Sequence, residues 1–298
     1  MDNKKKTFLP ALAAALGNII WGLSFLFTKV GLALTDPNVV LAHRFTVSTL
    51  LMLVTNRICG QKMSLKEKNW KPAILLMILQ QAYYVLETYG VLYTNATIAG
   101  LVLATVPVVA IATGALFLKE YPTLRQGLFC LLSVIGVILM TAAGSDLGVI
   151  RPIGMILLAA TCLSSAGYKT ANRKASRDFT SVERTFLVLA SSALFFNITA
   201  IGSVKGDMGA YIAPFREDGY LLAILGLSVF CSIAANILVN YAAANMSVFK
   251  VSSFGALSTL TSTVTGVLIL KEPMNLVLLI GAVLILAGIR EVTKNKTA

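Results

Sequence analysis

The side chains best suited to chemistry lie in one apolar stretch near residue 80. Gln80, Tyr83, Tyr84 and Glu87 are three or four positions apart or adjacent, so a helix with about 3.6 residues per turn places them on one face. A charge among apolar residues of a membrane costs about 2.5–3.5 kcal/mol, and such residues commonly face a cavity or a partner. Glu87 is therefore the first candidate for a functional residue in this chain.

Three interpretations of Glu87 follow from its chemistry. It binds the cation of an amine, with the rings of Trp21, Tyr83 and Tyr84 offering cation–π faces. It takes up and releases a proton that is coupled to the movement of another solute, because burial favours the neutral carboxyl. Or it belongs to a structural or gating ion pair. The candidate partners of that pair are Lys29, His43 and Arg44.

Polar side chains also recur at helical spacing in four other apolar stretches. The candidate binding residues in these stripes are Asn18, Trp21, Phe25, Tyr168, Asn172, Asn236, Asn240, Ser258 and Thr261. Each stripe alone is weak, because such side chains often only join helices at well under about 2 kcal/mol each. Three further cations are expected to extend to the cytoplasmic surface rather than bind substrate. They are Lys169, Arg173 and Lys250.

The elements that carry these residues are predicted from composition. The chain is 57% hydrophobic and 13% charged, whereas soluble domains are about 45–50% apolar and about 25% charged. A run of about 20 apolar residues crosses a bilayer as a helix. The predicted spans are 8–34, 38–58, 72–93, 96–118, 123–144, 152–172, 182–204, 219–244, 247–270 and 274–291. Pro107 is expected to kink the fourth.

Lysine and arginine are distributed unevenly between the two sides of these spans. If the N-terminus is cytoplasmic, most of them fall in cytoplasmic segments, as the positive-inside rule requires, and ten spans return the C-terminus to the cytoplasm. The net charge of +12 is then an orientation signal facing anionic lipid. No nucleic-acid partner is expected.

One phrase occurs twice, as TGALFLKE at 113–120 and as TGVLILKE at 265–272. The match extends over about three helices and indicates an internal repeat, with units at 1–145 and 146–298. Because five helices are an odd number, the second copy enters the membrane from the opposite side, which is typical of alternating-access transporters. Glu120 and Glu272, which end the two phrases, are expected to favour the positive end of the helix that follows each.

With these features the chain resembles the EamA-type drug/metabolite transporter superfamily. The resemblance rests on IIWGLSFLFTKVGL at 19–32, LAHRF at 41–45, the two LKE phrases and GAVLILAGI at 281–289. It implies an all-α fold of ten transmembrane helices, two inverted five-helix halves, and a central cavity bordered by helices one, three, four, six, eight and nine. Ser165 stands where the family often has a tryptophan.

The function predicted is secondary active transport, with no enzyme activity and no cofactor. The sequence contains no GxxxxGK[ST], GxSxG or HExxH motif. The expected substrate is a small polar or amphipathic metabolite, an amino acid or amine first, exported across a bacterial cytoplasmic membrane by a monomer or homodimer in lipid, with or without proton coupling. The alternatives are a channel or facilitative pore, and a carrier of a vitamin or nucleoside.

Overall fold

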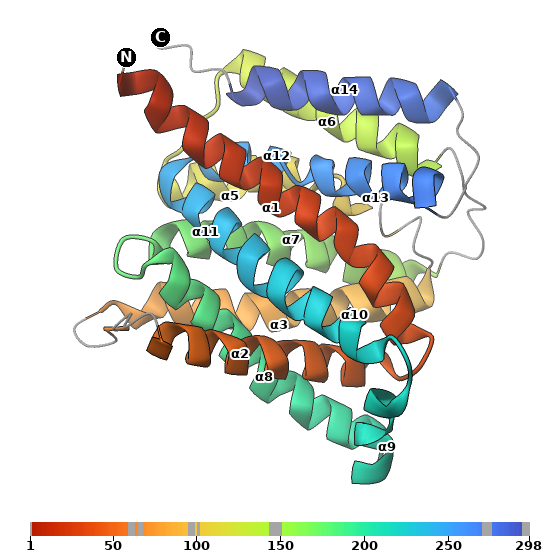
Figure 1. The fold of residues 1–298 in the computed structure, drawn as a ribbon. Helices are drawn as coiled ribbons and strands as arrows, with labels where there is room; N and C mark the ends of the chain where they lie inside the picture. Colours follow the sequence, from red (N-terminus) through yellow and green to blue (C-terminus); the bar gives the residue numbers. More distant parts are fainter. Residues whose placement is uncertain are drawn as a thin grey trace.

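The chain is folded almost wholly into helices that run roughly along one common direction (Figure 1). This computed structural model describes residues 2–58, 63–64, 68–94, 99, 102–142, 151–269 and 276–293, and none of them forms a strand. The all-α prediction is confirmed over these residues. The predicted connections at 94–95, 145–151 and 271–273 lie wholly or partly outside them, and the count of ten spans stays a prediction.

The first half of the chain contributes five described helices. They are α1 (Asp2–Leu32), α2 (Pro37–Ile58), α3 (Trp70–Tyr93), α5 (Val106–Leu118) and α6 (Leu124–Ala142). The second half is divided more finely. Its helices are α7 (Pro152–Ala175), α8 (Ser181–Ser203), α9 (Met208–Ile212), the 3-10 helix η1 (Ala213–Arg216), α10 (Tyr220–Gly226), the π-helix η2 (Leu227–Ala234), α11 (Ala235–Asn245), α12 (Val248–Ser253), α13 (Ala256–Ile269) and α14 (Leu276–Thr293).

Local sequence sets several of these boundaries. A proline stands at the start of α7, where its missing N–H costs nothing. Helix α8 begins with a capping box, in which the Glu183 N–H donates to Thr180 Oγ1 (3.2 Å) and the Thr180 N–H donates to Glu183 Oε2 (2.8 Å). Lys68 Nζ adds an ion pair to the same carboxylate at 2.6 Å.

Four of the helical segments are long and apolar enough to cross a membrane. They are Phe8–Leu32, Pro37–Ile58, Ser181–Ser203 and Tyr220–Asn245, and Val106–Leu118 and Leu124–Leu139 are shorter apolar helices. Although α3 and α7 have 24 residues each, they are not among the four. Both carry charged or amide side chains within their apolar runs, which lowers their mean hydropathy.

The contacts between helices are symmetric when the two halves of the chain are exchanged. The pair α3–α7 is matched by α11–α1, and α5–α7 is matched by α13–α1, while α2–α8 and α6–α14 each pair one half with the other. In Figure 1, α6 and α14 lie side by side at one edge, and α1 crosses the bundle beside α11. This exchange is the contact pattern that a five-helix repeat produces.

Helices α6 and α14 approach closely at two glycines that occupy the same position of the repeat. A Cβ at Gly136 would lie 2.7 Å from the Gly281 carbonyl oxygen, and one at Gly288 would clash with Ser133 Oγ. Small residues of this kind allow helix backbones to pack closely where lipid offers no hydrophobic gain.

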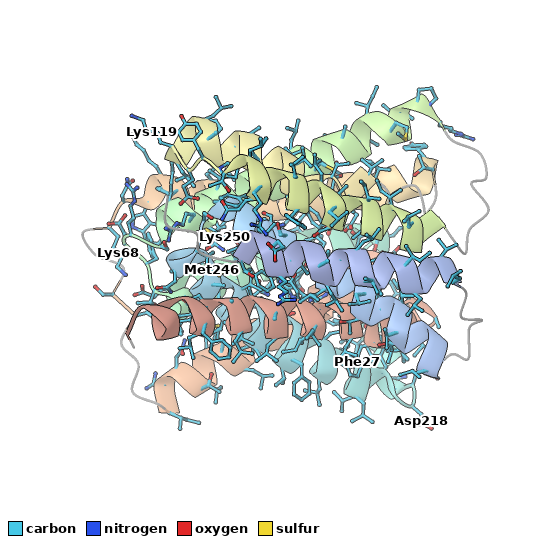
Figure 2. All side chains as sticks on the ribbon, turned by 90° about the horizontal axis from the view of Figure 1, so that it is seen from above. Phe27, Lys68, Lys119, Asp218, Met246 and Lys250 are labelled. Atoms are coloured by element: carbon cyan, nitrogen blue, oxygen red, sulfur yellow. The ribbon has the colours of Figure 1, made fainter. Side chains whose placement is uncertain are left out.

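The two ends of the bundle differ in charge. Figure 2 shows Lys68 and Lys119 at one end and Asp218 at the other. Helix α1 begins and helix α14 ends at the end that carries these lysines (Figures 1 and 2). We call it the terminal end and the other the opposite end.

Candidate functional site

A cavity of about 430 Å³ lies between the two halves of the bundle. It is lined by α1, α2, α3, α6 and α7 and by the residues around the starts of α5 and α13. The lining residues are Asn18, Trp21, Ser24, Arg44, Gln80, Tyr83, Tyr84, Glu87, Leu103, Ala104, Val106, Pro107, Ser133, Val134, Val137, Ser165, Tyr168, Lys169, Ser252, Gly255, Ala256, Ser258 and Thr259. The cavity is the size of a small-molecule site.

A break in a helix borders the cavity in each half of the chain. In the first half a turn at 104–105 precedes α5, and Pro107 stands in the first turn of that helix, so the kink expected at this proline coincides with a short turn in which Thr105 keeps right-handed helical dihedrals. In the second half a turn at 254–255 separates α12 from α13. Paired interruptions of this kind mark the binding sites of many secondary transporters.

The predicted polar face of α3 lines the cavity as a unit. Gln80, Tyr83, Tyr84 and Glu87 are all lining residues. The Tyr83 hydroxyl donates to Glu87 Oε1 at 2.8 Å, and the Tyr84 ring packs against Phe45, with centroids 5.7 Å apart. The carboxylate is therefore held by a neutral neighbour on its own helix.

Two of the three proposed ion-pair partners of Glu87, His43 and Arg44, are bonded to other residues. His43 Nδ1 lies 2.8 Å from the Tyr220 hydroxyl oxygen, and its ring contacts Tyr211 and Phe215. The Lys29 side chain is outside the described part of the structure. Within that part Glu87 forms no ion pair.

Arg44 lines the cavity and is held there by the π-helix η2. Arg44 Nε donates to Ser232 Oγ at 2.7 Å, and Ser228 Oγ donates to the Arg44 carbonyl oxygen at 2.9 Å. A π-helix changes the register of its side chains, and such segments often occur at functional sites. The sequence placed Arg44 as a partner for Glu87 and gave no signal for the π-helix.

Part of the predicted polar face of α1 lines the cavity. Asn18 and Trp21 line the cavity; Asn18 Nδ2 donates to the Ala14 carbonyl oxygen (2.7 Å), and Trp21 Nε1 donates to that of Cys231 (2.9 Å). Nothing is described for the Phe25 side chain. Thr261 packs against Gly22, where a Cβ would approach it to 2.6 Å, while Ser258, one turn earlier, lines the cavity.

The other predicted asparagines form a buried network outside the cavity lining. Asn172 Nδ2 donates to Asn240 Oδ1 at 2.7 Å, and Asn240 Nδ2 donates to Thr185 Oγ1 at 2.8 Å. The fully buried Arg184 donates to both backbone and side chain of Asn172 and to the Asn240 carbonyl oxygen. Asn236 bonds the Ser232 carbonyl oxygen of its own helix.

A second set of contacts joins the halves at the terminal end. Arg173 Nε donates to Glu120 Oε1 at 3.1 Å, and Arg173 also donates to the carbonyl oxygens of Ala243 and Ala244. The Val248 N–H donates to Glu120 Oε2 at 2.8 Å. The Glu120 carboxylate thus accepts a hydrogen bond from the first turn of α12 in the other half. We had expected it to interact with the N-terminus of α6, the helix that follows it in sequence. Arg173 is partly exposed at the terminal end, and there it also joins the two halves.

Lys169 is the lining residue whose place the sequence analysis predicted wrongly. It was expected at the cytoplasmic surface because it lies near the end of α7, yet it lines the cavity with Tyr168 and Ser165. Its spacing of four residues from Ser165 was the available signal. Ser24, Ser133, Ser252 and Thr259 were also missed as lining residues.

No group of three or more His, Cys, Asp or Glu residues that could hold a metal ion occurs in the described part of the chain. The cavity offers a carboxylate, two cations, hydroxyl groups and aromatic faces. These groups can bind and orient a small polar molecule. Helices long and apolar enough to cross a membrane, packed around a central cavity that carries charged and hydroxyl side chains, are typical of a membrane transport protein.

Comparison with known proteins agrees with this class. The sequence model of the EamA-like transporter family matches residues 8–142 and again 152–293, and the chain belongs to this family. It is 35% identical over 282 residues to the "Uncharacterized transporter YcxC" of Bacillus subtilis (strain 168), covering 93% of this chain and 90% of that protein. It is 28% identical to the "Uncharacterized transporter YvbV" of the same organism, covering 96% and 92%.

The fold is also similar to a solved crystal structure at 16% sequence identity. The TM-score is 0.80, and the alignment covers 95% of each chain. This likeness concerns the fold alone. The resemblance to EamA-type transporters that the sequence predicted is confirmed by the family match in both halves.

Proposed function

We propose that this protein is a secondary active transporter that moves an amino acid or amine across the bacterial cytoplasmic membrane by alternating access. The observation that carries the proposal is the central cavity, bordered by a turn between helical segments in each half and by the half-buried acid Glu87. In this proposal ten helices span the membrane as two inverted repeats, 1–145 and 146–298, and the terminal end faces the cytoplasm. The proposed direction is export, driven either by the concentration gradient of the substrate or by a proton gradient across the membrane.

Alternating access requires a cavity that is closed on one side at a time. Arg173, one turn of α7 after Lys169, is bonded to Glu120 of the first half. Its neighbour Asn172 is bonded to Asn240 of α11, within the second half. Arg184 and Asn240 complete a polar layer there. These contacts support a state closed toward the terminal end. A channel would need a continuous polar path past this layer.

Glu87 has the chemistry to bind an ammonium or to carry the coupling proton. Its one hydrogen-bond donor in the described structure is the neutral Tyr83 hydroxyl, so the carboxylate keeps acceptor capacity for a substrate. The aromatic rings of Trp21, Tyr83 and Tyr84 lie around the same cavity and favour a cation.

The test is uptake of labelled amino acids and amines into proteoliposomes loaded with the same unlabelled compound. We expect saturable exchange for at least one compound, and a loss of about tenfold or more in kcat/KM in Glu87→Gln, because a charged hydrogen bond is worth about 1.5–3 kcal/mol.

Glu217→Gln, which removes an exposed acid near the opposite end, is the matched control and is expected to transport as the native protein does. Non-saturable flux in the native protein would point to a pore. Unchanged rate, affinity and pH dependence in a folded Glu87→Gln protein would exclude a role for this acid.

A further inference from the structure

Lys169 presents a cation to the cavity without a protein partner. It lines the cavity from α7, and neither a hydrogen bond nor an ion pair engages its ammonium within the described residues. A cation at this depth is costly, and such residues commonly serve a substrate or ion path. Arg173, one turn further on, has three hydrogen-bond partners, so two neighbouring cations of the same helix differ in whether the protein engages them.

A second polar group on the cavity wall also lacks a partner. Ser252 is 1% exposed, and its Oγ makes no hydrogen bond. It lines the same cavity from α12, which packs against α7. Buried hydroxyl groups are nearly always hydrogen-bonded, so a free donor on a cavity wall indicates a ligand that accepts from it.

Glu87, the one acid among the described lining residues, lies toward the opposite end. Helices α3 and α7 run antiparallel, with Gly90 against Leu158 and Gly167 against Leu79. At a rise of about 1.5 Å per residue, this register separates the Glu87 and Lys169 Cα atoms by about 12–15 Å along the bundle.

The two charged side chains lean toward each other across that interval. In a helix the Cα–Cβ bonds tilt toward the N-terminus, so antiparallel helices tilt Glu87 and Lys169 in opposite directions. The N-terminus of α3 lies on the Lys169 side, and that of α7 on the Glu87 side. The two form no ion pair with each other, and both remain available to a ligand between them.

We propose that Lys169 and Ser252 form an anion subsite that binds the carboxylate of a zwitterionic substrate whose ammonium lies at Glu87. This inference rests on the proposed function and selects amino acids over simple amines. One ammonium and one hydroxyl donor match a monovalent carboxylate. The apolar wall of Leu103, Val134 and Val137 takes the side chain of the substrate.

The test uses three probes that differ only in their charged groups: L-leucine, 4-methylpentanoate, which lacks the ammonium, and 3-methylbutylamine, which lacks the carboxylate. Binding to the purified protein is measured by calorimetry. In Lys169→Gln we expect leucine and 4-methylpentanoate to bind about 10- to 100-fold more weakly, because a charged hydrogen bond is lost, and 3-methylbutylamine to bind as before. Glu87→Gln is expected to show the reverse selectivity.

Three further variants serve as controls for folding and charge and test the second residue of the subsite. Arg177→Gln removes an exposed cation just after the same helix and is expected to bind all three probes normally. Lys169→Arg keeps the charge and is expected to retain carboxylate binding, which separates charge from folding. Ser252→Ala is expected to weaken the two carboxylates by about three- to tenfold.

The subsite is refuted if folded Lys169→Gln binds leucine as tightly as the native protein, or if the native protein binds the amine and neither carboxylate. Exchange by the same preparations in proteoliposomes then decides the proposed function separately. Saturable exchange of any compound would support the proposed transport function, and the absence of exchange for every compound in the panel would refute it.

Discussion

Replacing Glu120 by glutamine is expected to open the terminal end of the cavity. The Glu120 carboxylate accepts hydrogen bonds from Arg173 Nε (3.1 Å) and from the Val248 N–H (2.8 Å). It thereby ties α5 of the first half to α7 and α12 of the second. If the halves separate at this end during transport, both bonds exist only in the closed state.

The size of the effect follows from these two contacts. Hydrogen bonds to charged groups are worth about 1.5–3 kcal/mol. The two side chains are 20% and 28% exposed, so solvent screening favours the lower part of that range. A loss of about 1.5–2 kcal/mol changes the ratio of closed to open molecules by about 10- to 30-fold.

The assay is the rate at which a membrane-impermeant thiol reagent labels a cysteine placed in the cavity. Ser165→Cys supplies the thiol at a lining position, in a protein whose four native cysteines are alanine. Reagent is applied from the side of the terminal end. We expect Glu120→Gln to raise the labelling rate by about tenfold or more.

Glu291→Gln is the matched control, because it removes the acid of another ion pair between the halves, Arg125–Glu291 at 2.6 Å. That pair joins α6 to α14, away from the cavity lining, and its arginine is 51% exposed. Little change in labelling is expected. If folded Glu120→Gln labels within about twofold of its parent, these bonds do not hold the cavity closed.

Two further predictions concern packing and the polar layer. Gly288→Ala is expected to lower the melting temperature, because its Cβ would meet Ser133 Oγ and the Phe129 carbonyl oxygen and overpacking costs about 1–3 kcal/mol. The control Gly202→Ala has open space around it and is expected to be tolerated. Equal melting temperatures of the two variants would contradict the close α6–α14 contact. Arg184→Ala is expected to lower the free energy of unfolding by about 2–4 kcal/mol, because the buried carbonyl oxygens of Asn172 and Asn240 lose their donor. Arg216→Ala, at an exposed site, is the control. If both variants denature alike, the buried network around Arg184 adds no stability.

Much of the fold follows from local sequence. Long apolar runs predict helices, and the turn at 35–38 and the capping box at Thr180 mark where two of them begin. The repeated phrase predicts two related halves, and the exchangeable contacts of α3–α7 and α11–α1 have the form that such halves produce. The face of α3 was also predictable, because the positions of Gln80, Tyr83, Tyr84 and Glu87 depend only on the pitch of one helix.

The remaining site residues depend on which helices meet, and no single stretch contains that information. Asn172 and Asn240 satisfy each other across 68 positions of sequence, so they join helices instead of lining the cavity. Lys169 resembles a surface lysine when α7 is considered alone, and only the packing of α3, α6 and α12 around it gives it a cavity to face.

The sequence by itself determined the class of the protein, its helical stretches, its internal repeat and the position of the acid on the polar face of α3, because these depend on composition and on spacing along one chain segment. The tertiary structure decided where the cavity lies, which polar groups are already satisfied and which remain open to a ligand. It did so because a hydrogen bond such as that from Arg44 to Ser232, held by a π-helix, exists only when segments far apart in the sequence are brought together.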